Sequence, residues 1–90
     1  MLDKGNRLIN FTAKYFNTTP AKLKGTRDNY VTERESAITL LNYYGVDTIS
    51  ICFLFNKTRK KVMEILEQDV YIDDLINAYE QTYRERLDRT

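Results

Sequence analysis

The sequence of 90 residues contains no histidine and no tryptophan, and its only cysteine is Cys52. A single cysteine cannot form an internal disulfide, which is typical of a protein that works in the reducing cytoplasm. Without histidine, and with its one cysteine in an apolar run, the chain lacks the usual ligands of a structural zinc site. We therefore expect no metal, no cofactor and a cytoplasmic location.

The lack of histidine also removes the commonest general base of enzymes. The chain has no serine-centred constellation and no glycine-rich phosphate loop. Its neighbouring carboxylates, Asp73 and Asp74, fit the preference of acidic residues for a helix N-terminus. We predict no catalytic residues, no enzymatic activity and no small-molecule substrate.

Long apolar runs are missing as well. No stretch approaches the roughly 18–20 apolar residues of a membrane span, so we expect no membrane association. The first residues, M-L-D-K-G-N-R, lack the apolar segment of a secretory signal. Ninety residues indicate a single domain over 1–90, which we divide into a core over 1–68 and a C-terminal amphipathic helix over 69–90.

The charges that are present are unevenly distributed, although the net charge is only +1. Residues 1–62 carry eleven Lys and Arg against five Asp and Glu, whereas residues 63–90 carry three against eight. A basic body with an acidic tail can present one face to polyanions. The near-neutral total also fits charges that merely coat a small domain.

Apolar residues recur every three or four positions, so we predict an all-α fold, a small helical bundle without strands. The expected helices cover about 3–16, 20–24, 32–44, 49–55, 59–68 and 69–87, the last being a long amphipathic helix. Residues 26–31 are expected to form a loop. The expected N-terminal caps are Thr19, Thr32 (in a capping box with Glu35), Asp47 or Thr48, and Thr58.

The most informative segment is N-K-T-R-K-K at 56–61, which lies between two short apolar stretches. A short helix, a tight corner and a second helix that opens with cations are typical of a helix-turn-helix. Cations at a helix N-terminus oppose the helix dipole by ~0.3–1 kcal/mol each, so selection for stability alone would avoid them. The alternative interpretation is a solvated helix start that binds nothing.

Several stretches resemble the C-terminal DNA-binding domain of the bacterial replication initiator DnaA. T-A-K-Y-F at 12–16 is similar to the family's V-A-x-Y-F, and A-K-L-K-G at 21–25 to its D-L-x-G. K-G-T-R at 24–27 matches its basic loop, and E-R-E-S-A-I-T-L at 33–40 fits the frame of its next helix. Ile51, Phe55 and Val62 occupy its helix-turn-helix apolar positions. The family's D-H-T-T signature is T-R-K-K at 58–61, and Cys52 replaces a family glycine.

The resemblance implies a helix-turn-helix fold and a surface that faces duplex DNA. It places Arg27 in a minor groove and the helix after Thr58 in the major groove. From their chemistry, Arg59 would read a base edge, at least one of Lys60 and Lys61 would meet phosphate, and Lys57 with Thr58 would hold a backbone phosphate. The full set of expected DNA-binding residues is Lys24, Arg27, Arg34, Lys57, Thr58, Arg59, Lys60 and Lys61.

Two functions follow from these patterns. The first is a small DNA-binding protein with a regulatory or accessory role, for example in transcription or replication. The second is a protein–protein or structural component of a phage or mobile-element assembly that keeps the fold without DNA binding. The acidic C-terminal helix would then lie across a basic protein partner, or its stripe of Tyr79, Tyr83 and Leu87 would mediate a homodimer.

Overall fold

Helices account for nearly all of the chain that the computed structural model describes, which is residues 2–25 and 28–88, with side chains described for 3–25 and 29–82. The elements are α1 (Leu2–Tyr15), α2 (Pro20–Lys24), a 3₁₀ turn η1 (Asp28–Tyr30), α3 (Val31–Tyr43), α4 (Thr48–Phe55), α5 (Arg59–Glu67) and α6 (Asp73–Asp88). No strand occurs in these described ranges, so the all-α prediction is confirmed.

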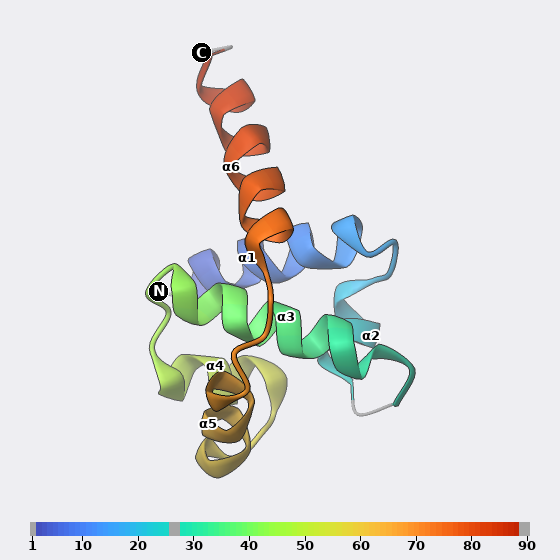
Figure 1. Ribbon diagram of the computed structural model, residues 1–90, viewed down its shortest axis with the longest axis vertical. Helices are drawn as coiled ribbons and strands as arrows, with labels where there is room; N and C mark the ends of the chain where they lie inside the picture. Colours follow the sequence, from blue (N-terminus) through green and yellow to red (C-terminus); the bar gives the residue numbers. More distant parts are fainter. Residues whose placement is uncertain (1, 26–27, 89–90) are drawn as a thin grey trace.

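Helix α3 lies at the centre and contacts α1, α2, α4 and α5 (Figure 1). Its buried side chains Ala37, Ile38, Leu40 and Leu41 spread over a wide face, as a helix with neighbours on several sides requires. The rest of the buried apolar core comes from the surrounding helices and, at Ile72, from the segment just before α6: Leu8, Ile9, Ala13, Leu23, Ile51, Phe55, Val62, Ile65, Ile72 and Leu75.

Three predicted N-terminal caps are confirmed. The Thr19 hydroxyl accepts a hydrogen bond from the backbone N–H of Lys22 at 3.2 Å. The Asp47 carboxylate accepts one from the N–H of Ser50 at 3.1 Å. Each cap satisfies a backbone donor that the first turn leaves without a helical partner. The third cap, Thr58, belongs to the candidate site.

Two predicted helix starts are wrong. Helix α3 begins at Val31 without a side-chain cap, because the 3₁₀ turn η1 runs directly into it and Thr32 already lies inside the helix. The final helix begins at Asp73 and not near 69, because Asp69 adopts a left-handed backbone with φ of 55° that interrupts helical continuation.

Helix α6 projects from the body and accounts for the longest of the principal extents, 40 × 25 × 23 Å (Figure 1). Of the other helices, its principal contact is with α1. Its 16 residues exceed the average helix by only about one turn, so a C-terminal helix is present but the long helix predicted over 69–90 is not shown.

Candidate nucleic-acid interface

A three-residue connection joins α4 to α5. Helix α4 ends where Asn56 takes a left-handed backbone, with φ of 51° and ψ of 49°. The N–H of Lys57 then donates to the carbonyl of Cys52 at 3.0 Å, which closes the helix end in the manner of a left-handed cap. Asparagine is among the few residues that tolerate this conformation, so Asn56 explains the sharpness of the corner.

The corner leads directly into the cap of α5. The Thr58 hydroxyl accepts a hydrogen bond from the backbone N–H of Lys61 at 3.2 Å, which confirms the predicted start of this helix. Ile51, Phe55 and Val62 are buried in one core, and α4 contacts α5. The two helices are therefore held at a set angle by a shared core and not by the connection alone.

The first turn of α5 displays its cations to solvent. Arg59, Lys60 and Lys61 are all exposed, while the next residue, Val62, is buried. Because successive helical residues are about 100° apart, Lys60 points directly away from the core and its two neighbours flank it. The structure thus brings three of the predicted DNA-binding residues together on one exposed turn.

Lys57 sits half-buried at the corner beside this turn. Burial lowers the pKa of its ammonium group, and the positive charges of Arg34 and Lys61 lower that pKa further. Positive charge is therefore concentrated enough here to work against the protonation of a lysine. Such concentration opposes stability and favours the approach of an anion.

Arg34 does not occupy the exposed position expected of a DNA contact. It is only 4% exposed, and its Nε donates a hydrogen bond to the backbone carbonyl of Leu23 at 2.8 Å. Its side chain turns inward because the N-terminal end of α3 packs against α2. We therefore correct the prediction: Arg34 holds α2 against α3 through its hydrogen bond to Leu23, and its buried positive charge helps to lower the pKa of Lys57.

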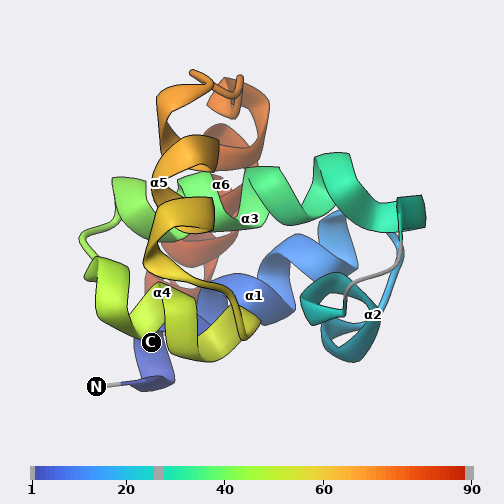
Figure 2. The ribbon, with the colours of Figure 1, turned by 90° about the horizontal axis from the view of Figure 1, so that it is seen from below.

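The other two candidates lie at and after the end of α2. Lys24 is the last residue of that helix and is half-buried, next to the carbonyl that Arg34 holds. Arg27 lies outside the described residues. Figure 2 shows α2 and α4 on the same side of α3. Lys57 lies close enough to Arg34 for the two positive charges to repel each other.

Sequence reasoning missed two features of α4 and α5. Glu64 and Glu67 are exposed one and two turns beyond the cations of α5, so only the first turn of that helix is basic. On α4, Ile49 and Phe53 are 76% and 73% exposed. Their spacing of four residues places them on one helix face. This spacing is visible in the sequence and could have predicted the pair.

A third surface was also missed. Arg7, Phe11 and Lys14 recur at helical spacing on α1 and line a hollow against α6, away from the α4–α5 corner. The described side chains contain no group of three metal-ligating residues. Among the described helices, none has the length and apolarity needed to cross a bilayer.

Comparison with family models finds no match for this chain, and comparisons with curated proteins and with solved structures likewise find none.

Proposed function

We propose that this chain is a small DNA-binding protein that contacts duplex DNA through α4 and α5 acting as a helix-turn-helix. In this arrangement, the first turn of α5 enters the major groove. Arg59 reads a base edge, since a guanidinium can bond both O6 and N7 of guanine. Lys60 and Lys61 neutralise phosphates, and Lys57 with the capped helix start holds the backbone beside them.

The observation that carries this proposal is the outward display of Arg59, Lys60 and Lys61 on a helix start whose next residue is buried. The N-terminal residues of a recognition helix lie deepest in the groove, so this is the turn where base and phosphate contacts are needed. The backbone of this packed turn loses little further freedom on binding, while each long side chain that is immobilised costs about 0.5–1.5 kcal/mol.

The setting of Lys57 supports the same proposal. Its lowered pKa reflects burial and repulsion from Arg34 and Lys61, which is a cost to the folded protein. A phosphate group at the corner would offset that repulsion and stabilise the charged lysine. The clustering of like charges is thus explained by an anionic ligand and not by stability.

Glu64 and Glu67 limit how α5 can approach DNA. Both are exposed on the outer face of α5, where they would repel phosphates if the helix lay full length in the groove. We infer that α5 enters by its N-terminal end. Lys24 and Arg27 would then reach the neighbouring backbone or minor groove, as the resemblance to the DnaA DNA-binding domain suggests.

The test is a fluorescence anisotropy titration of a labelled random-sequence duplex at several salt concentrations. The double variant R59A/K60A should weaken binding by about tenfold or more and reduce the salt slope by ~0.9 for each phosphate that it no longer neutralises. The matched control is R7A/K14A, which removes the same charge from the exposed α1 surface. Equal effects of the two variants would show that only overall charge matters and would overturn the proposal.

A second candidate function, a protein–protein component of a phage or mobile-element assembly, is favoured by the exposed pair Ile49 and Phe53. Two large apolar side chains on one helix face are typical of a contact surface. Sedimentation of the wild type and of I49S/F53S separates the two functions. Self-association that the variant abolishes, together with no duplex binding by the wild type, would support this second candidate.

A further inference from the structure

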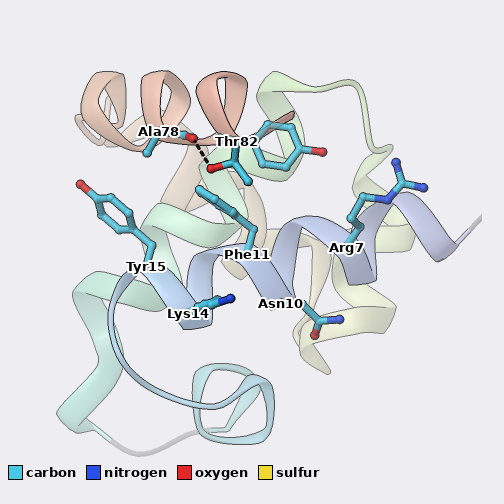
Figure 3. Close-up of a pocket in the computed structure, with 8 residues that line it drawn as sticks. Arg7, Asn10, Phe11, Lys14, Tyr15, Ala78 and Thr82 are labelled. Carbon is cyan, nitrogen blue, oxygen red and sulfur yellow. Dashed lines mark hydrogen bonds between the residues drawn. The ribbon is translucent and has the colours of Figure 1, made fainter. Parts of the chain in front are cut away.

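A hollow of about 550 Å³ lies between α1 and α6, within the size range of ligand-binding clefts (Figure 3). Its walls come from one face of α1 and from Ala78, Tyr79 and Thr82 of α6. In Figure 3, Phe11 points from α1 toward α6, with Arg7 and Tyr15 at opposite ends of the row. Figure 1 shows that α6 leaves the body at the end away from α4 and α5, so this hollow is separate from the candidate DNA surface.

The floor of the hollow is aromatic. The ring of Phe11 meets the edge of Tyr79 with centroids 5.1 Å apart and lies 6.3 Å from Tyr15. Tyr79 also packs against Tyr44, which anchors the cluster to α3. Rings already held in these arrangements offer an apolar surface that needs little rearrangement to bind a partner.

The aromatic surface extends from the edge of the hollow onto exposed side chains. Tyr15 is 44% exposed, and Tyr71 is 69% exposed. Tyr71 lies beside Asp74, whose charge raises the pKa of the Tyr71 hydroxyl, and Tyr15 is close enough to add to that shift. Tyrosine and arginine are the residues most often responsible for binding energy at protein interfaces, and here both types gather on one surface.

The rim of the hollow is positively charged. Arg7 and Lys14 are both exposed on α1, on either side of Phe11, and none of the lining residues that the structure describes is acidic. Seven residues separate the two cations, which corresponds to roughly 10 Å along the helix axis. That spacing is matched by two carboxylates seven residues apart on a partner helix lying along α1.

We propose that this hollow binds an acidic amphipathic helical segment of a partner protein. Leucine or aromatic side chains of the segment would lie on Phe11, Tyr15 and Tyr79, and its carboxylates would pair with Arg7 and Lys14. This is the helix-in-groove mode of recognition, in which anchors at helical spacing fill an apolar groove. The proposal does not depend on DNA binding by α5.

The experiment is selection of a random 16-residue phage-displayed peptide library on the wild-type protein, with counter-selection on R7E/K14E. The peptides that survive are synthesised, labelled and titrated by fluorescence anisotropy. We expect them to carry net negative charge with leucine or aromatic residues three or four positions apart. R7E/K14E should weaken their binding by about tenfold or more, since each exposed pair changes from attraction to repulsion.

The control variant K60E/K61E carries the same charge reversal on α5 and should leave peptide binding within about twofold. Thermal unfolding of all variants, followed by circular dichroism, shows whether each is folded. A selection that enriches nothing above R7E/K14E, or that enriches neutral or basic peptides, would overturn the proposal. Equal loss with K60E/K61E would also overturn it, as would a single-stranded oligonucleotide that binds wild type but not R7E/K14E and displaces the peptides.

Discussion

The Nε of Arg34 donates a hydrogen bond to the backbone carbonyl of Leu23 at 2.8 Å, and both residues are buried. This bond connects the third helix to the short second helix across eleven positions of sequence. It also places a permanent positive charge beneath Lys57, whose pKa it helps to lower. One buried side chain therefore serves both the packing of α2 and the electrostatics of the candidate DNA surface.

The first prediction concerns Arg34 itself. Arg34→Met keeps the apolar stem but removes the donor, so the Leu23 carbonyl loses its partner. We expect the free energy of unfolding to fall by about 1–3 kcal/mol, measured by urea denaturation. The matched substitution Arg59→Met, at an exposed position, should stay within about 0.5 kcal/mol of the wild type. Equal stability of both variants would show that the buried bond contributes nothing.

The second prediction concerns Lys57, whose pKa is lowered from 10.5 by burial, Arg34 and Lys61. Because the folded chain holds this proton less tightly than the unfolded chain, stability due to Lys57 rises as the pH rises toward 10.5. Lys57→Met should therefore raise the free energy of unfolding at pH 7, and this gain should shrink above about pH 10. Urea denaturation of the wild type and Lys57→Met at pH 7 and above about pH 10 measures this difference in stability. If the stability gain of Lys57→Met grew with pH, the stated repulsion would be contradicted. The same variant should also bind duplex DNA more weakly.

The third prediction concerns the acidic residues on the outer face of α5. If that helix enters DNA by its N-terminal end, Glu64 and Glu67 stay outside the groove and repel the phosphates only from a distance. The double variant E64Q/E67Q should strengthen duplex binding by about two- to tenfold at low salt, and less as salt screens the charges. Glu80→Gln, on exposed α6, is the control and should change nothing. Weaker binding by E64Q/E67Q would exclude this orientation.

The fourth prediction concerns Tyr44, whose buried hydroxyl has no hydrogen-bond partner among the described residues. Burial, followed by the charge of Glu80, raises the pKa of Tyr44 to about 12. Since the unfolded phenol ionises near pH 10, the stability that the neutral form contributes is lost between about pH 10 and 12. Tyr44→Phe should keep or slightly raise the free energy of unfolding at pH 7, and should lose less stability than wild type over that pH range.

The measurement for Tyr44 is absorbance at 295 nm during a pH titration, paired with urea denaturation. The matched control is Thr12→Val, because the buried Thr12 hydroxyl does donate a hydrogen bond, to the Leu8 carbonyl at 2.8 Å. In that variant the Leu8 carbonyl loses the Thr12 hydroxyl and keeps only its helical partner. The free energy of unfolding should fall by about 0.5–1.5 kcal/mol. A larger loss from Tyr44→Phe than from Thr12→Val would show that the Tyr44 hydroxyl is satisfied in the folded protein.

The predicted caps show how far local sequence reaches. Thr19, Asp47 and Thr58 each bond a backbone N–H three residues away, so each cap depends only on its immediate neighbours. The capping box at Thr32 failed for a reason beyond that range. The chain enters α3 through the turn η1, and the helix is already under way before Thr32.

The candidate site also has one part that local sequence predicts and another that depends on distant residues. Exposure of Arg59, Lys60 and Lys61 could be predicted, because a cap at Thr58 and a buried Val62 leave those three positions facing outward. The burial of Arg34 could not, because its partner lies in another helix and nothing near it in sequence marks an inward orientation. The hollow between α1 and α6 was equally hidden, since its walls are more than sixty residues apart.

By itself, the sequence determined the helical class, most helix boundaries and the basic first turn of α5. These depend on a 3.6-residue period and on hydrogen bonds that span a few residues. The tertiary structure decided that Arg34 is buried, where α6 leaves the body and which side chains of α1 line the hollow beside it. Those outcomes depend on burial against distant helices, and the physical cause is that desolvation and packing act between residues far apart in the chain.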